Sequence, residues 1–190
     1  NDSTPIFSGS SIPGSIIRIY DNNELIASTT VDAEGNWEIQ SPELDDEEHS
    51  ITVTVQEEGS TESEPNGPLD FTVDTSAPEQ TAVISNVYDD VNDIGDIASG
   101  ASTDDTAPQL QGTLSEVLGD GEELNVLRDG VVIGQAVIDD SDPANITWIF
   151  DDTGLVDGEE YVYQVQVIDA AGNTGELSNE YTISIDSSWP

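Results

Sequence analysis

The stretch Leu69-Asp70-Phe71-Thr72-Val73-Asp74-Thr75-Ser76-Ala77-Pro78 contains a strand and the joint that ends it. Apolar and polar side chains alternate from Leu69 to Val73, and this period of two is typical of a half-buried β-strand. Asp74 ends the alternation, while Pro78 excludes a helix and keeps the residue before it extended. The stretch therefore predicts a strand followed by an extended joint at the boundary of a structural module.

The same joint of acidic, small and proline residues occurs again along the sequence. Asp2-Ser3-Thr4-Pro5 precedes the first predicted strand, and residues 104–108 repeat the pattern near the middle. Residues 183–190 contain an echo of it at the end. Because a repeated joint indicates repeated modules, we predict two domains, residues 1–76 and residues 77–190. We also expect the sequence to belong to a longer chain.

Both predicted modules are made of short alternating segments, and neither contains a run with helical periodicity. Turn residues recur at intervals of roughly 8–12 residues, which is the spacing of a β-sandwich. We therefore predict an all-β chain of two tandem, Ig-like, Greek-key β-sandwiches in an elongated arrangement. The predicted strands of the first module are 6–10, 15–20, 25–31, 37–39, 50–56 and 69–73; those of the second are 81–88, 110–113, 124–128, 131–138, 146–150, 161–167 and 179–185, with a loop over 89–106.

The charge is strongly one-sided, with 41 acidic residues against two arginines and a net charge of −39 over 190 residues. Such a surface excludes nucleic acid as a direct partner and disfavours anionic membranes. The sequence also has no apolar run long enough for membrane insertion. The absence of cysteine excludes disulfides and thiolate zinc sites. Two interpretations of the acids remain open and compatible: a solvated surface, and a subset of carboxylates that bind hard cations.

A few residues have specific structural interpretations. Residues 155–161 are similar to the tyrosine corner of immunoglobulin-like folds, and His49 takes the place of Tyr161 in the first module. We interpret His49 as a corner residue that hydrogen-bonds to the backbone, because a lone histidine cannot form a catalytic triad or a zinc site. Trp37 and Trp148 occupy matched positions and are predicted to lie in the core. The two arginines are predicted to form local ion pairs.

Four motifs together resemble the bacterial Ig-like repeats in the extender regions of giant, RTX-type, type I-secreted adhesins. They are Asp74–Pro78, Tyr88–Val91, Ser102–Pro108 and Asp169–Asn173. The second module carries the resemblance best, since the first lacks the front strand and has Gln56-Glu57-Glu58-Gly59 where the last motif is expected. The resemblance implies an extracellular, calcium-stiffened rod on the bacterial cell surface, which holds ligand-binding domains away from the cell in attachment or biofilm formation. Its partners would be neighbouring repeats of the same chain, and we expect a monomer.

Following strand directions by their alternation places acidic residues in two clusters. Calcium takes six to eight oxygen ligands in flexible geometry, whereas transition metals would need several histidines or cysteines, and this sequence has one histidine and no cysteine. We therefore predict Ca²⁺ as the bound ion, without an EF-hand loop. Asp93 and Asp96 are as consistent with solvated turn residues as with further ligands. The predicted ligands of the second module are Asp89, Asp90, Asp104, Asp105, Asp129 and Asp186, and those at the joint are Asp74, Asp169, Asn173, Asp21 and Asp2.

These residues discriminate between three functions. The leading prediction is a non-catalytic structural spacer stiffened by calcium at the joint and in the acidic loops. The alternative is a calcium-dependent carbohydrate- or protein-binding module, which would need an exposed aromatic patch. An enzyme is not predicted, because no nucleophile accompanied by a base and an orienting group can be identified.

Overall fold

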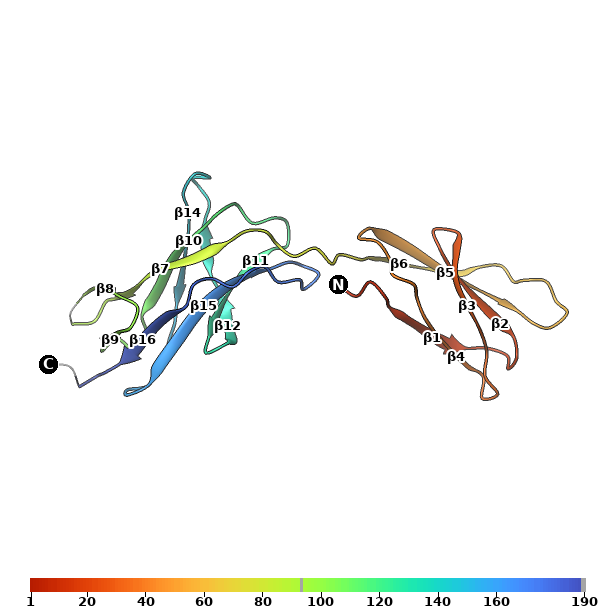
Figure 1. Cartoon of the computed structure of the whole chain (residues 1–190), viewed down its shortest axis with the longest axis horizontal. Helices are drawn as coiled ribbons and strands as arrows, with labels where there is room; N and C mark the ends of the chain where they lie inside the picture. Colours follow the sequence, from red (N-terminus) through yellow and green to blue (C-terminus); the bar gives the residue numbers. More distant parts are fainter. Residues whose placement is uncertain (93, 189–190) are drawn as a thin grey trace. The chain divides into compact units, whose positions relative to one another are not determined.

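The computed structural model describes residues 1–92 and 94–188, and these residues form β-strands joined by turns and loops (Figure 1). Within the described residues there is no α-helix, as the sequence predicted, and hence none that could cross a membrane. The chain divides into two compact units, which we call unit 1 (Asn1–Ser76) and unit 2 (Ala77–Pro190). Asp93 and the final pair Trp189-Pro190 lie outside the described residues.

Unit 1 is a sandwich of a two-stranded and a four-stranded antiparallel sheet. The smaller sheet pairs β1 with β4, and the larger has the order β3-β2-β5-β6. Buried and less buried side chains alternate along its strands, as the sequence predicted. In β2, for example, the side chains of Ile17 and Ile19 are buried, while Arg18 between them is not. The strands are β1 (Ile6–Ser10), β2 (Ile16–Asp21), β3 (Glu24–Thr30), β4 (Asn36–Gln40), β5 (Glu48–Gln56) and β6 (Asn66–Thr72).

Unit 2 is a sandwich of two five-stranded sheets. One sheet has the order β13-β14-β10-β7-β8 and the other the order β12-β11-β15-β16-β9. All pairs are antiparallel except β9 with β16, which is parallel. The strands are β7 (Ala82–Asp89), β8 (Gly95–Ile97), β9 (Ala101–Thr103), β10 (Gln109–Leu114), β11 (Glu123–Arg128), β12 (Val131–Gln135), β13 (Val137–Asp139), β14 (Ile146–Asp151), β15 (Glu160–Ile168) and β16 (Tyr181–Ile185).

Two predicted elements of unit 2 were wrong in detail. The segment 89–106 is not only a loop, because it contains β8, which continues β7's sheet, and β9, which pairs with β16. The single strand predicted over 131–138 is two strands that belong to different sheets, with β12 on β11 and β13 on β14. The change of sheet follows Gly134, where a side chain would meet the ring of Phe150 at 2.7 Å.

The two cores differ in size although the strand patterns correspond. In unit 2 the inward faces of both sheets enclose Trp148, which is 1% exposed, together with Leu110 and Tyr163. In unit 1 the matched Trp37 is only half-buried and packs against a smaller group of isoleucines and valines. Trp148 is thus a core residue, as predicted, and Trp37 lies at the margin of its core.

The difference follows from the neighbours of one strand. In unit 2, β10 lies between β14 and β7, and a side chain on Gly112 would come within 2.0 Å of the Val83 carbonyl oxygen and 2.4 Å of the Trp148 ring. In unit 1 the matched strand β1 pairs with β4 alone among the described residues. A side chain on Gly9 would meet only the ring of Trp37, at 2.8 Å. Gly112 therefore permits a close approach of two strands that Gly9 does not have to accommodate.

This difference predicts unequal costs for two matched substitutions. Gly112→Ala should lower the free energy of unfolding of unit 2 by at least about 1–3 kcal/mol, because a backbone carbonyl and a buried indole must both move. Gly9→Ala should cost unit 1 less, because the half-buried indole of Trp37 can shift. Urea unfolding of the full chain, followed by amide NMR signals assigned to each unit, measures both. If both substitutions lowered the free energy of unfolding equally, the close approach of strands at Gly112 would not be the cause of the difference.

Candidate functional site

An acidic hollow lies in unit 2 beside the segments that connect β7, β8, β9 and β10. It has a volume of about 360 Å³, and four aspartates from separate segments line it. Asp89 ends β7, Asp96 lies in β8, Asp104 follows β9 and Asp186 follows β16. Three of these four are predicted ligands, and for Asp96 the sequence is equally consistent with a solvated turn residue.

The buried carboxylates around the hollow hold the loops together. Asp89 is 5% exposed; it accepts hydrogen bonds from the Thr103 hydroxyl at 2.5 Å and the Val91 amide at 2.8 Å. Asp105 is 2% exposed and accepts from the amides of Ala107 at 2.7 Å and Asp90 at 3.4 Å. The pKa of Asp105 lies above its ordinary value because burial, and then the charges of Asp89 and Asp90, outweigh these hydrogen bonds. An added cation would therefore relieve repulsion at this place.

The remaining predicted ligands near this end are held by local contacts. The Asp104 carboxylate accepts from the side-chain amide of Asn92, and Asp186 accepts from the Ser188 amide and hydroxyl. Asp90 contributes its amide to Asp105, and its side chain is exposed. Asp129 lies instead in the β11–β12 turn, where its carboxylate accepts from the Val162 amide at 3.0 Å, and it does not line the hollow.

Asp169 and Asn173 form a closed turn after β15. The carboxylate of Asp169 accepts from the Asn173 amide and from its side-chain nitrogen, each at 2.8 Å. Burial raises the pKa of Asp169, but these bonds and the amides of Ala171 and Gly172 outweigh it, so the pKa lies below the ordinary value. Asp169 therefore stays ionised in the folded protein.

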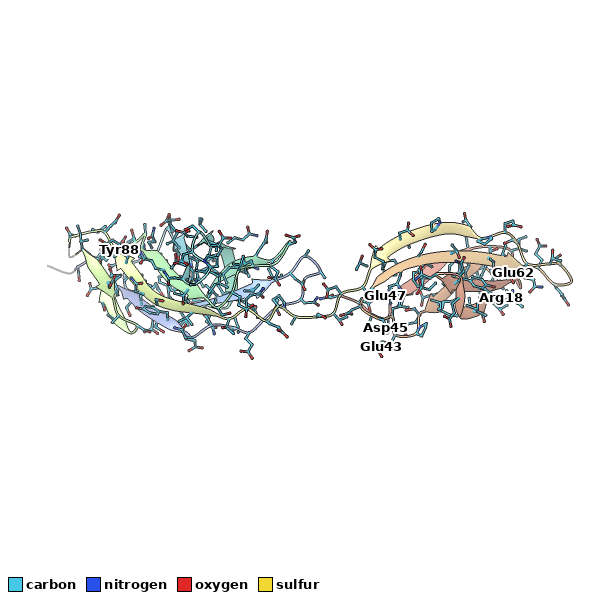
Figure 2. All side chains as sticks on the ribbon, turned by 90° about the horizontal axis from the view of Figure 1, so that it is seen from above. Arg18, Glu43, Asp45, Glu47, Glu62 and Tyr88 are labelled. Atoms are coloured by element: carbon cyan, nitrogen blue, oxygen red, sulfur yellow. The ribbon has the colours of Figure 1, made fainter. Side chains whose placement is uncertain are left out.

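The acidic residues predicted for unit 1 lie around the corner that leads into β5. The Leu44 amide donates to the Ser3 carbonyl oxygen, and the Val73 amide donates to the Glu47 carbonyl oxygen. The corner is therefore hydrogen-bonded to the first and the last residues of unit 1. Figure 2 shows Glu43, Asp45 and Glu47 at the corner and the Arg18–Glu62 pair at the opposite end of the sandwich. Asp2 accepts from the Thr4 amide, Asp74 accepts from the Ser76 amide, and Asp46 accepts from the hydroxyls of Thr75 and Ser76.

The corner itself contains a histidine–aspartate pair that the sequence did not indicate. In unit 2, the Tyr161 hydroxyl accepts from the Val156 amide at 2.9 Å, which confirms the tyrosine corner. In unit 1, His49 is 3% exposed; its Nε2 lies 2.9 Å from the Asp45 carbonyl oxygen, as predicted for a corner residue. Its Nδ1 also lies 2.7 Å from Asp21 Oδ2, while Asp21 Oδ1 accepts from the Ser50 amide.

Both partners of the His49 ring are hydrogen-bond acceptors, so the ring can satisfy both only as an imidazolium. Burial lowers the pKa of His49, but the Asp45 carbonyl, the Asp21 carboxylate and the charge of Glu47 outweigh it, and the pKa lies above its ordinary value. A raised pKa contributes stability that is complete below the unfolded-state value of about 6.5 and is lost as the pH rises through the folded-state value.

We therefore expect the stability difference between the wild-type chain and His49→Gln to depend on pH. It should be largest well below pH 6.5 and should shrink as the pH rises above that value, as the folded imidazolium loses its proton. Asp21→Asn should lower the titration midpoint of His49, measured by the NMR shifts of its ring protons. Using the difference between variants removes the general effect of pH on the other carboxylates. A difference that is constant over this range would contradict the charged pair.

A second unpredicted network lies in the core of unit 2. The carboxylate of Asp152, which is buried, accepts from Arg128 Nη1 through both oxygens at 2.9 Å and from the Tyr163 hydroxyl at 2.6 Å. Burial and then Asp152 raise the pKa of Tyr163, which keeps its proton. Arg128 also lies 5.5 Å from the centre of the Tyr161 ring. Both arginines thus form ion pairs, as predicted, but neither partner is a sequence neighbour: Arg18 pairs with Glu62, and the Arg128–Asp152 pair is part of a core network.

The donor chemistry around the acidic hollow suits a hard cation, because carboxylate, hydroxyl and carbonyl oxygens line it. Their arrangement is not that of a formed metal centre: within the described residues, no three acidic or histidine side chains converge closely enough to hold an ion. The carboxylates are occupied by hydrogen bonds within the chain. Binding an ion would require some of these side chains to turn toward the hollow.

Comparison with known proteins identifies the fold of unit 1. Residues 1–75 match the family model of a bacterial Ig-like domain. This match covers unit 1, and the sandwich of unit 2 has the corresponding strands with four additional ones, β7, β8, β9 and β13. No curated protein matches the chain.

Several solved structures are similar to this chain at low identity. They include latent PorU from Porphyromonas gingivalis (TM-score 0.40, 13% identity, 97% of this chain and 20% of that chain). A 1.5-MDa bacterial ice-binding adhesin gives a TM-score of 0.34 at 14% identity over 97% of this chain and 58% of that one. Titin I67–I69 gives 0.35 at 10% identity over 96% and 59%. The chain thus spans a fifth of the PorU chain and over half of the other two, and these scores define no function.

Proposed function

We propose that this chain is a non-catalytic spacer from a large adhesin, exposed outside a bacterial cell. The observation that supports this most directly is the repetition of one β-sandwich in tandem, with an acidic joint at the start of each unit. The match of unit 1 to a bacterial Ig-like domain supports a bacterial surface setting. A spacer needs stable modules and no reactive centre, and the polar networks at Asp152 and His49 both serve the fold.

We further propose that calcium stiffens the chain. The acidic hollow, with Asp89, Asp104 and Asp186 on its wall and Asp90 and Asp105 beside it, is the place in unit 2 where an oxygen-binding cation would relieve repulsion. Asp129 was also predicted from the sequence as a ligand of this set, but it does not line the hollow. The second predicted set, with Asp74 at the joint, would bind calcium by the same chemistry. The set comprises Asp74, Asp169, Asn173, Asp21 and Asp2.

In this proposal the sites work as a switch between compartments. Extracellular calcium modules bind at about 10⁻⁴–10⁻³ M, so their sites are empty in a cytosol and filled outside the cell. A site at a hundred times its Kd adds about 2.7 kcal/mol to stability. Export by a type I system and a role in biofilm formation belong to the same proposal.

Small-angle scattering with matched melting curves tests the spacer and its calcium together. In millimolar calcium we expect a narrow, extended distance distribution and a raised melting temperature, both reversed by chelation. Magnesium at equal ionic strength is the control, because its stricter octahedral geometry suits these loops less well. The triple variant Asp89→Asn, Asp104→Asn and Asp186→Asn should lose the part of the response that comes from unit 2. Scattering and melting curves that are identical with calcium, magnesium and chelator would contradict the proposal.

A further inference from the structure

Strands β7 and β16 are the first and last described strands of unit 2, and they run in the same direction through it (Figure 1). Near their starts, the side chain of Asn179 before β16 hydrogen-bonds to Ile84 in β7. At their far ends, Thr103 donates its hydroxyl to Asp89, which ends β7, and its carbonyl oxygen accepts from the amide of Asp186 after β16. The chain therefore enters unit 2 at one end of the sandwich and leaves β16 at the other. Tension on the chain pulls β7 and β16 in opposite directions along their own axes.

Strand β16 is hydrogen-bonded on both of its sides. On one side it pairs with β15, and the Ile185 amide donates to the Glu159 carbonyl oxygen at 2.9 Å. On the other side it pairs with β9, and the Gly100 amide donates to the Thr182 carbonyl oxygen at 2.7 Å. Because these bonds lie across the strand, a pull along β16 loads them together in shear. A pull that lifts one end of β16 out of the sheet would instead load them one after another.

Strand β7 lies between β10 and β8, and a side chain completes its second edge. The carboxamide of Asn179 accepts from the Ile84 amide at 3.0 Å through Oδ1 and donates to the Ile84 carbonyl oxygen at 3.2 Å through Nδ2. Since β8 pairs with β7 only from Val87 onward, this carboxamide takes the place of a neighbouring strand at Ile84. A second tie joins the same two sheets, because the Tyr181 hydroxyl at the start of β16 donates to the Ile97 carbonyl oxygen of β8.

We propose that unit 2 bears tension along the chain, and that Asn179 is the side chain that couples its first strand to its last. Load on β16 passes through the segment at Asn179 into β7, close to the point where the chain enters the unit. The unit unfolds only when several bonds across β7 or β16 break together, which makes unfolding under force slow. The inference rests on the proposed spacer role, because a spacer is held at both of its ends, but it requires no bound calcium.

Single-molecule force spectroscopy on the full chain, in millimolar calcium throughout, tests the proposal with two directions of pull. In the first, the chain is held by its two ends, and the length released on unfolding distinguishes unit 1 from the longer unit 2. In the second, it is held by its C-terminal end and by the thiol that Val156→Cys introduces into a sequence without cysteine. Val156 is 56% exposed and precedes β15, at the end where the Gly158 amide donates to the Ile185 carbonyl oxygen. The second pull therefore peels β16 from β15.

We expect unit 2 to resist the first pull more strongly than the second. Held by its ends, it should unfold at a force at least about twice that of the peeling direction, because bonds loaded together share the force. Both directions are measured on the Val156→Cys chain, so a difference in overall stability cannot account for the result.

A matched pair of variants tests Asn179 itself. Asn179→Ala should speed the unfolding of unit 2 by on the order of tenfold at a fixed end-to-end force. It should leave the peeling force unchanged, because peeling begins at Ile185 and reaches Asn179 last. Ser178→Ala is the control, since the Ser178 hydroxyl accepts from the Val165 amide at 2.9 Å and so ties the same segment to β15 rather than to β7. This control should change the end-to-end unfolding rate by less than about threefold.

Native dispersion of the amide spectrum checks that each variant is folded. The comparison of the two directions of pull stands without either substitution, so the proposal remains testable if one variant does not fold.

Three results would overturn the proposal. Equal unfolding forces in the two directions would show that unit 2 has no preferred direction of load. A loss of equal size in both directions for Asn179→Ala would show that this side chain contributes only to general stability, and no change in either would show that it carries no load. A failure here would leave the scattering test of the spacer and its calcium intact, and a failure of that test would leave the comparison of forces intact.

Discussion

The mutual repulsion of 41 carboxylates constrains every part of this protein, since only two arginines oppose it. The fold meets the constraint by local hydrogen bonding. Asp89, Asp105 and Asp169 each accept backbone amides from their own loops. Inside the core, Asp152 accepts hydrogen bonds from Arg128 and from the Tyr163 hydroxyl. Asp21 is paired with His49, the single histidine. Where neither a cation nor enough N–H donors are available, as between Asp89, Asp90 and Asp105, the charge remains poorly compensated.

The second determinant of the structure is the set of strands that flank the matched strands β1 and β10. β10 has β14 on one side and β7 on the other, and the core beneath it is closed. β1 has only β4 among the described strands, and Trp37 and Leu69 beside it line a groove of about 420 Å³. Strand β7 therefore accounts for the close approach at Gly112, and together with β8 and β9 it accounts for the larger core of unit 2.

Much of this architecture could be predicted from the period of two, because alternation identifies a half-buried strand whatever its partners are. The tyrosine corner and the burial of Trp148 could be predicted because each depends on a local motif or on a repeat match. The short strands β8 and β9 could not, since three residues are too few to show a period. Nor could the pairs His49–Asp21 and Arg128–Asp152, whose members come from separate strands or loops and meet only when the register is known. The acidic hollow was partly predictable from strand direction, whereas Asp129 bonds to the neighbouring strand β15, because Val162 lies opposite it.

We propose that the poorly compensated carboxylates of unit 2 select a divalent cation. Calorimetric titration of calcium into the full chain at physiological ionic strength tests it most directly. We predict saturable binding with a Kd of about 10⁻⁴–10⁻³ M, weakened when Asp89 and Asp104 are both changed to asparagine. Heats that rise without saturation and are the same in that variant, and with magnesium, would show that the acids are only a solvated surface.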